Sequence, residues 1–318
     1  MSQNSIPVID IGRLHDPGTL AELDTACREW GFFQVVNHGM RQETMDGILA
    51  RAREFFAQPI EAKRGISRTA ENARGFYDKE LTKNTRDWKQ IYDYGPAEGA
   101  KRRPQWPEAM TEFRRTVLDY YGACEALAFR LLIAIANNLG VPSNCLLAGF
   151  LPDHSSFLRL NYYPKCPRPE RPEGINTPSN GHLGLNHHTD AGTMTLLLQD
   201  SQPGLEVYRN GDWHLVEPRR DALVVNVGDM VQVWSNDRYP AALHRVIASS
   251  DAERFSVPFF FCPAYSVDYA PLPTTIDGRT PPRYSRINWG EFYDKRAAGD
   301  YADFGEEVQI SHYRINGG

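Results

Sequence analysis

The run Leu205-Glu-Val-Tyr-Arg-Asn-Gly-Asp-Trp-His-Leu-Val216 predicts a β-hairpin in the second half of the chain. Its two ends favour strands, and Asn210-Gly211 between them is the strongest short-range signal for the tight turn of a hairpin. Other short apolar runs, separated by turn residues, lie at residues 156–163, 193–198, 222–227, 230–234 and 254–261 and around His188 and His244. About eight short strands, spaced at roughly 8 to 12 residues, predict an antiparallel sandwich or barrel.

The first half of the chain alternates between strand and helix patterns. Residues 6–11 and 32–36 predict strands, and residues 19–30 and 42–56 carry apolar side chains at helical spacing. A long helix is expected from Pro107 to about Leu139, and a last helix over residues 283–298. Three further segments are expected: a long, partly irregular polar stretch at 61–106, a loop at 164–181 and a tail at 301–315 that packs back.

These patterns predict the α+β class and a single domain over residues 1–318. Within it we expect a helical and mixed region at 1–150, a β core at 151–270 and a C-terminal helix with its tail at 271–318. The hydrophobic fraction of 41% is enough for a large core.

Composition also limits the partners and the cellular compartment that we expect for the protein. The net charge of −5 is mild and the basic residues are scattered, which argues against nucleic acid or an anionic membrane surface as a partner. The five cysteines form no Cys-x-x-Cys pair, so we expect neither a disulfide framework nor a zinc ribbon. No apolar run approaches the roughly 18 residues that span a bilayer. A cytoplasmic protein is expected, as a monomer or weak homo-oligomer.

A candidate metal site begins at His188 and Asp190. Residues two apart on a strand point to the same face, and the distant His244 can join them across the sheet. Two imidazoles and one carboxylate leave three open positions on an octahedral metal, as in non-haem Fe(II) oxygenases. The same ligands also serve catalytic zinc, and a strand-end histidine with a capping aspartate is the structural alternative. His187 would point to the opposite face, so we expect it not to be a ligand.

A candidate carboxylate site lies ten residues beyond His244, at Arg254 and Ser256. They too are two apart, and a guanidinium fork with a hydroxyl suits a bidentate carboxylate. The strand around Arg254 is apolar, where an unpaired charge is costly. The same period brings Phe260 to this face. Asn161 and Tyr163 form a similar pair on another strand, although each singly can be structural.

Motifs along nearly the whole chain resemble the Fe(II)/2-oxoglutarate-dependent oxygenases of the isopenicillin N synthase-like group, which includes plant flavonoid and gibberellin oxidases. In family order they are Ile6-Pro-Val-Ile-Asp10, Gly31-Phe-Phe-Gln-Val-Val-Asn-His-Gly39, Gln105-Trp-Pro107, Asn161-Tyr-Tyr-Pro-Lys-Cys-Pro167, His188-Thr-Asp190, Thr195-Leu-Leu-Leu-Gln-Asp200, Gly204-Leu-Glu-Val207, Val225-Asn-Val-Gly-Asp229, Ser235-Asn236, His244-Arg-Val246 and Arg254-Phe-Ser256. The resemblance implies a double-stranded β-helix, or jelly roll, which agrees with the strand count.

The resemblance also implies roles for individual residues. It implies Fe(II) ligands at His188, Asp190 and His244. Arg254 and Ser256 would hold the distal carboxylate of 2-oxoglutarate. Three further positions follow: Tyr163 as another hydroxyl to that carboxylate, Asn161 near the metal-bound end of the cosubstrate, and Phe260 in the substrate pocket. The implied cofactors are Fe(II), 2-oxoglutarate and O2, with ascorbate as an expected reductant.

The implied activity is oxidation of an unactivated C–H bond in a small molecule, expected to be a specialised metabolite, with release of succinate and CO2. Hydroxylation, desaturation and ring closure all remain open. We expect the substrate pocket to draw on Phe260, the 61–106 segment, the 165–182 loop and the C-terminal helix, with Tyr77, Trp88, Tyr92 and Tyr265 as candidate lining residues. Aromatic walls suit a flat or apolar molecule, and a modified amino acid or peptide stays open as a substrate. Two alternatives stay open: an oxidase of the isopenicillin N synthase type that needs no 2-oxoglutarate, and a non-redox metal-containing jelly-roll binding protein or zinc cupin-like isomerase.

Overall fold

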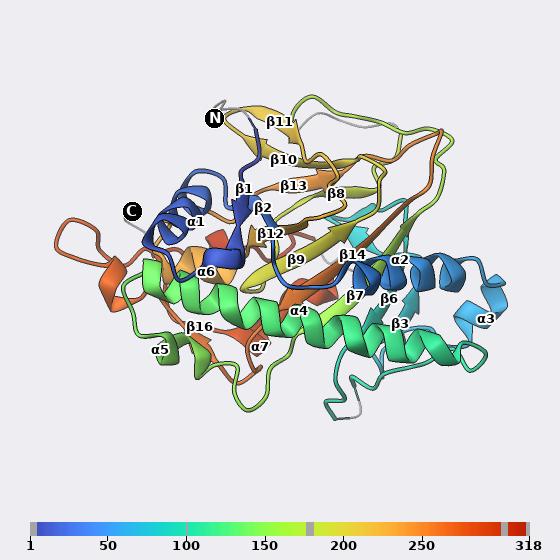
Figure 1. Ribbon diagram of the computed structural model, residues 1–318, viewed down its shortest axis with the longest axis horizontal. Coiled ribbons are helices and arrows are strands. Elements are labelled where there is room, and N and C mark those ends of the chain that lie inside the picture. Colours follow the sequence, from blue (N-terminus) through green and yellow to red (C-terminus); the bar gives the residue numbers. More distant parts are fainter. Residues whose placement is uncertain (1–4, 100, 176–180, 300–304, 316–318) are drawn as a thin grey trace.

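Two β-sheets and a set of helices form the molecule, which a computed structural model describes over residues 5–99, 101–175, 181–299 and 305–315 (Figure 1). The larger sheet has eight strands in the order β1 (Val8–Asp10), β2 (Phe32–Val36), β12 (Leu223–Val227), β9 (Met194–Gln199), β14 (Arg254–Phe261), β7 (Phe157–Tyr163), β6 (Gln90–Tyr94) and β3 (Gly75–Tyr77). The smaller sheet has the order β11 (Asp212–Leu215), β10 (Leu205–Arg209), β13 (His244–Val246) and β8 (Leu185–His188). Neighbouring strands are antiparallel except β1 and β2.

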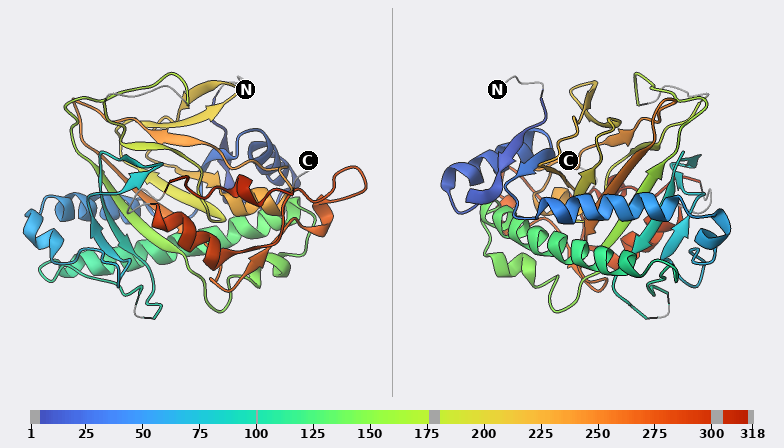
Figure 2. Two further views of the ribbon diagram at one scale, coloured as in Figure 1. Left: turned by 180° about the vertical axis from the view of Figure 1, so that it is seen from behind. Right: turned by 45° about the vertical axis from the view of Figure 1, so that its right-hand side comes forward.

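Helices cover the outer face of the larger sheet. In Figure 1, α4 (Thr111–Asn138) and α2 (Gln42–Phe56) run across it, and α1 (Pro17–Glu29) lies beside β1 and β2. Seen from behind, α7 (Trp289–Ala298) comes forward and α4 passes behind it (Figure 2). The short helices are α3 (Ile60–Arg64), α5 (Ser143–Leu147), α6 (Asp229–Trp234), η1 (Ile11–Arg13), η2 (Pro273–Thr275) and η3 (Ile310–Tyr313). The short strands are β4 (Leu81–Thr82), β5 (Thr85–Arg86), β15 (Asp268–Tyr269) and β16 (Ile287–Asn288).

Alternation along the central strands separates the core from the space between the sheets. On β14, Phe255 and Phe259 face the helices, where their rings meet Phe56 of α2 and Tyr121 of α4 at 6.4 and 5.1 Å between centroids. Arg254 lies on the opposite face of the same strand, because successive side chains of a strand point to opposite sides. The helix side is therefore an apolar core, and the other side can carry polar groups.

The predicted elements agree with the structure where a strong local signal exists. Strand β2 and helix α2 have the predicted bounds. The hairpin of β10 and β11 turns at Asn210 and Gly211, whose φ angles of 53° and 94° are the left-handed values that this turn demands.

Four expectations about the chain path were wrong or lie outside the described residues. Residues 230–234 are helix α6, not a strand; nearly every residue of this helix is buried, so its apolar run carries no periodicity. The segment 61–106 supplies β3 and β6 to the larger sheet. Helices α4 and α7 begin later than expected, at Thr111 and Trp289. Residues 176–180 of the predicted loop and 301–304 of the predicted tail lie outside the described residues.

None of the helices in the described ranges combines the length and the apolar character that crossing a bilayer would require.

A substitution at Gly31, between α1 and β2, tests how closely this turn packs against the Pro240 backbone. Gly31 has φ of 58°, and a Cβ there would lie 2.1 Å from the Pro240 carbonyl oxygen. We expect Gly31→Ala to cost about 3 kcal/mol of unfolding free energy, because left-handed strain and overpacking add. Gly211→Ala is the matched control, since a Cβ there meets nothing within 4 Å and only the backbone strain, about 1 kcal/mol, remains. Urea unfolding measures both, and equal losses would contradict the close fit.

Candidate metal and carboxylate site

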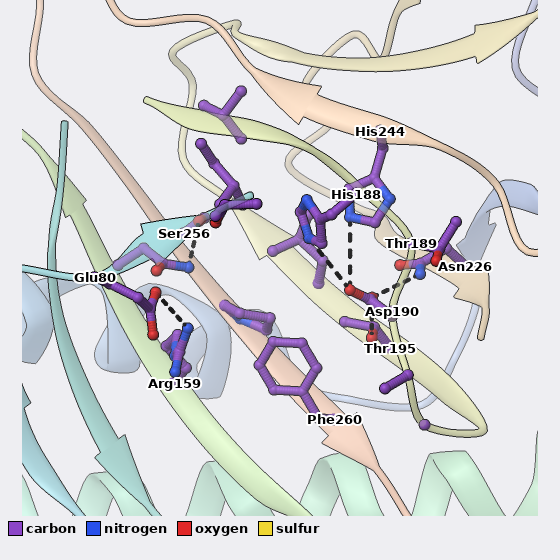
Figure 3. Close-up of a pocket in the computed structure, with 18 of the residues that line it drawn as sticks. Glu80, Arg159, His188, Thr189, Asp190, Thr195, Asn226, His244, Ser256 and Phe260 are labelled. Carbon is purple, nitrogen blue, oxygen red and sulfur yellow. Dashed lines mark hydrogen bonds and ion pairs between the residues drawn. The ribbon is translucent and has the colours of Figure 1, made fainter. Parts of the chain in front are cut away.

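Three side chains converge at one end of the smaller sheet. His188 ends β8 and His244 begins β13, and the two residues are direct cross-strand neighbours with ring centroids 4.3 Å apart. Asp190 Oδ1 lies 3.4 Å from His188 Nε2 and 3.7 Å from His244 Nε2. One ligand atom from each of the three residues lies within 4.8 Å of the others, and Figure 3 shows the side chains pointing toward one another.

The convergence differs in one respect from the geometry expected from the sequence. Asp190 lies two residues beyond the end of β8, not on the strand with His188. Its carboxylate still points to the same place as the His188 imidazole, with Oδ1 3.4 Å from Nε2, as the two-residue spacing predicts. The strand argument does hold for His244 and His188, which the sheet itself places side by side.

Hydrogen bonds fix which atoms of the three side chains face the common point. The Nδ1 atoms of His188 and His244 lie 2.9 and 3.0 Å from the carbonyl oxygens of Asn186 and Ala242. Donation from Nδ1 leaves each Nε2 lone pair for a metal. Asp190 Oδ2 accepts from Thr195 Oγ1 at 2.5 Å and from Asn226 Nδ2 at 2.7 Å, which leaves Oδ1 toward the histidines.

Thr195 and Asn226 were not singled out from the sequence as site residues. Both lie in strands of the larger sheet, β9 and β12, and reach across to the loop that carries Asp190. Each belongs to a motif that carried the family resemblance, and that was the only sequence signal for them.

The electrostatics favour the ligand forms of Asp190 and His244. Burial alone would raise the pKa of Asp190, but the neighbouring His244 and His188 and the hydrogen bond from Asn226 hold it well below its usual range. Burial, with His188 alongside, lowers the pKa of His244 to about 4. An ionised carboxylate beside a neutral imidazole suits a divalent cation.

His187 does not join this group. Its ring nitrogen Nδ1 lies 3.0 Å from Asn186 Oδ1, and it is absent from the three converging residues. Burial and the charge of Lys83 lower its pKa to about 4.

A cavity runs between the two sheets from this cluster, and Arg254 lies on its wall. The residue is 4% exposed, and its Nη2 donates to Gln199 Oε1 at 2.8 Å. Its Nε and Nη1 are buried and have no hydrogen-bond partner within the described ranges, and no ion pair is formed there. The neighbouring wall is apolar, with Leu205 and Val246. A buried guanidinium with two unsatisfied nitrogens fits an anion that binds in this cavity.

The other predicted binding residues line the same cavity. Cross-strand pairing of β7 and β14 sets Tyr163 beside Arg254 and Asn161 beside Ser256. Asn161 Nδ2 donates to Ser256 Oγ at 3.3 Å, and the Arg254 guanidinium lies 5.2 Å from the centre of the Tyr163 ring. Farther along β14, Phe260 also faces the cavity and stacks on Phe157 at 4.6 Å.

The four other aromatic residues expected in the substrate pocket are not on its wall. Tyr92 lies on the helix face of β6, where its hydroxyl donates to the Gln105 carbonyl. Trp88 donates to the Pro164 carbonyl, and Tyr77 lies against Arg68. Tyr265 lies behind Tyr293. Aromatic type alone does not say which face of a strand a side chain takes, so a part for these four residues in substrate binding stays a prediction.

Two groups of cavity residues were not named individually from the sequence, although the C-terminal helix and the 61–106 segment were expected to contribute to the pocket. One is the α7 wall, with Trp289, Tyr293 and Arg296. The other is a buried ion cluster, in which Arg159 pairs with Asp93 at 2.7 Å and with Glu80 at 2.9 Å (Figure 3). The cluster also contains Arg68, Asp87 and Lys89. Its members come from separate segments that the larger sheet brings together, so spacing along the chain does not reveal it.

Family models match both halves of the chain. The model of the 2OG-Fe(II) oxygenase superfamily matches residues 154–263, and a model described as non-haem dioxygenase in morphine synthesis N-terminal matches residues 6–109. Protein DMR6-LIKE OXYGENASE 2 of Arabidopsis thaliana is 34% identical over 92% of this chain and 84% of its own. Flavanone 3-dioxygenase 2 of Oryza sativa subsp. japonica is 34% identical over 93% of this chain and 84% of its own.

Solved structures agree with these matches. The structure of JOX2 in complex with 2OG, Fe and JA has a TM-score of 0.82 and 31% identity, covering 98% of this chain and 89% of that one. The structure of a full-length Neurospora crassa protein in complex with alpha-KG and thymine has a TM-score of 0.80 and 25% identity, covering 95% of this chain and 99% of that one.

Removing one hydrogen bond to Asp190 tests how its carboxylate is oriented. Thr195→Val deletes the Oγ1 donor while keeping the shape, and we expect metal affinity to fall roughly 10- to 100-fold, as for other groups that orient metal ligands. Anaerobic titration with Co(II) measures it. Thr193→Val is the matched control, because Thr193 is equally buried but its hydroxyl contacts only Met230 Sδ. Equal affinities in the two variants would contradict the role of Thr195.

Proposed function

The chain belongs to the 2OG-Fe(II) oxygenase superfamily, and we propose that it oxidises an unactivated C–H bond of a small specialised metabolite by hydroxylation, desaturation or ring closure. It is a non-haem iron enzyme whose cofactors are Fe(II), 2-oxoglutarate and O2. Bound together, the cofactors supply the oxidising power, with release of succinate and CO2. In this proposal, the two facing sheets form the double-stranded β-helix of the family.

His188, Asp190 and His244 hold Fe(II) in this proposal. The support is the chemistry of the donor set: two Nε2 atoms and one carboxylate oxygen, each directed to the common point by hydrogen bonds on its other side. Two histidines and one carboxylate are the ligands that non-haem Fe(II) oxygenases use, and they leave positions for a chelating cosubstrate.

Arg254, Ser256 and Tyr163 hold the distal carboxylate of 2-oxoglutarate, with Asn161 nearer the metal. One observation carries this part: the Arg254 Nε and Nη1 atoms are buried without partners among the described residues, in the same cavity as the metal ligands. A planar carboxylate satisfies such a fork with two parallel hydrogen bonds. The apolar residues around the fork strengthen that pairing because they exclude water.

The substrate occupies the rest of the cavity, between Phe260 and helix α7. Phe157, Phe260, Trp289 and Tyr293 form its aromatic walls, which suit a flat or apolar molecule. Among the similar structures, that of JOX2 contains JA and that of the Neurospora crassa protein contains thymine. A small molecule of comparable size is the substrate class that we propose here.

The two adjacent histidines offer a test of the metal assignment. We expect His188→Ala to lose Fe(II) binding and succinate formation, because it removes a ligand atom from the three-residue cluster. His187→Ala is the matched control, one residue away and outside the cluster, and should keep both within about threefold. Iron content and succinate release report the outcome. Loss of iron in the His187 variant alone would reverse the assignment.

The carboxylate assignment is tested at Arg254. We expect Arg254→Gln to raise the KM for 2-oxoglutarate roughly 100-fold, since losing a charge-assisted pair in a buried site costs about 3 kcal/mol. Arg254→Lys should recover part of the loss, because lysine keeps the charge but not the fork. Succinate formation against cosubstrate concentration gives the KM. If product forms in both variants with wild-type kinetics and without succinate, the enzyme is an oxidase that does not use 2-oxoglutarate.

A further inference from the structure

Arg74, the residue before β3, is a buried cation without a compensating partner. It is 3% exposed, its Nε is buried without a hydrogen-bond partner, and its guanidinium forms no ion pair within the described ranges. The guanidinium lies over the face of Phe157, 4.9 Å from the ring centre. Burying a charge in this way is costly unless something pairs with it.

The other buried arginines show how unusual this is. Arg68 and Arg245 face carboxylates at 3.1 and 2.8 Å. Arg296 donates to three oxygens, those of Thr189, Val308 and the Gln309 side chain. Arg254 has one acceptor, Gln199, and is the proposed cosubstrate site. No side-chain acceptor for the Arg74 guanidinium lies in the described part of the chain, and its Nε is buried without a partner, as Nε and Nη1 are in Arg254. Arg74 is therefore a second candidate for an anion.

Arg74 lies at the end of the cavity remote from Arg254. Strand β7 runs from Phe157 to Tyr163, and Tyr163 is the cross-strand neighbour of Arg254. Six residues of strand separate the two ends by about 20 Å. Phe157 lines the cavity and lies against Arg74, so this one ring separates the guanidinium from the cavity.

A hydroxyl without a partner lies at the same end. Tyr265 Oη is buried and accepts or donates no hydrogen bond within the described part of the chain. Burial raises the pKa of Tyr265, whereas the nearby Arg74 and Arg102 act to lower it. The Tyr265 ring packs on Tyr293, which lines the cavity, at 5.5 Å between centroids. The guanidinium of Arg74 and the hydroxyl of Tyr265, both hydrogen-bond donors, therefore lie together behind the cavity wall.

The neighbouring charges do not compensate Arg74. Three cations of the ion cluster, Arg68, Lys89 and Arg159, match its three carboxylates, Glu80, Asp87 and Asp93. Glu98 is beyond ion-pair distance from Arg74, and its side chain is half exposed and 3.9 Å from Arg102. No carboxylate of the described residues therefore lies within ion-pair distance of the Arg74 guanidinium, although Glu98 acts on it at longer range.

We propose that Arg74 and the Tyr265 hydroxyl form a second anion-binding subsite, which takes a carboxylate of the organic substrate. The substrate class is then a monocarboxylic acid with a flat or apolar body between Phe260 and α7. A single guanidinium balances one negative charge, and its planar fork matches a carboxylate. Arg74 itself is not on the cavity wall, so the subsite requires the Phe157 side chain to rotate and admit the carboxylate. This subsite rests on the proposed function, because the rest of the cavity is the substrate site of that proposal.

Matched pairs of acids and amides test the subsite. The probes are phenylacetate against phenylacetamide and cinnamate against cinnamamide, which differ in charge and hardly in shape. They are added anaerobically to the enzyme loaded with Fe(II) and 2-oxoglutarate, and binding is followed through the visible charge-transfer absorbance of that complex. We expect wild-type enzyme to bind the acids at least about tenfold more tightly than the amides. Arg74→Gln should abolish this difference, and Tyr265→Phe should reduce it about threefold.

Arg102→Gln is the control variant, because it removes a cation 4.0 Å from the Tyr265 ring that already has Asp294 as a partner. It should keep the preference for acids. An equal response to acids and amides in wild-type enzyme, or an unchanged preference in a folded Arg74→Gln variant, overturns the subsite. If Arg74→Gln does not fold, Tyr265→Phe supplies the comparison, and Arg74→Lys, which keeps the charge but not the fork, should weaken the preference for acids without abolishing it.

Two further measurements separate the ways in which the test can fail. If the charge-transfer absorbance does not form in wild-type enzyme, the proposed function fails, and thermal shifts of the metal-free protein by acids against amides still test the subsite. The melting temperature of unliganded Arg74→Gln distinguishes a structural role. If Arg74 serves a ligand, its removal should leave the melting temperature unchanged or raise it, because the unliganded protein no longer buries an unpaired charge. A melting temperature several degrees lower, with the preference for acids intact, assigns Arg74 to packing.

Discussion

The alternation of side chains along β7 and β14 is the constraint on which the site depends. One face of these strands is sealed by α2 and α4, so every second residue must be apolar. The residues between them can be polar, and they are: Tyr163, Asn161 and Arg159 on β7, Arg254 and Ser256 on β14. A shift of register by one residue would exchange the core with the site, so the same packing that stabilises the sheet fixes the positions of the binding groups.

The same alternation decides which site residues can be predicted from the sequence. Period two placed Arg254 with Ser256 and Asn161 with Tyr163, and the structure sets all four on the cavity. The spacing of two also brought Asp190 beside His188, although Asp190 lies beyond the end of β8. It was no guide for Tyr92, whose face depends on where its strand joins the sheet. The ion cluster and Arg74 depend on contacts between distant segments, and no local pattern encodes those contacts.

The two unsatisfied nitrogens of Arg254 on the cavity wall have a consequence for the binding free energy. A folded chain normally pairs its buried charges, as Arg245 does with Glu206. The Arg254 guanidinium is buried without such a pair, which costs free energy in folding, and this cost is recovered when an anion binds. The fork is then oriented before the ligand arrives, since it is held by Gln199 and by the Tyr163 ring, and little further ordering is needed on binding.

The same reasoning explains how a dicarboxylate can select one arginine among several in a single cavity. Arg159 lies two residues along β7 from Asn161, close to the proposed path of the cosubstrate. Its Nε and Nη2 already donate to the two oxygens of Asp93, and its Nη1 donates to Glu80. Both edges of that fork are engaged by carboxylates of the protein, so an incoming carboxylate would have to displace one of them and leave a buried charge behind. Arg254 has no such competitor among the described residues. The compensated cluster thus gives the cavity a polar wall without creating a second strong site for 2-oxoglutarate beside the first.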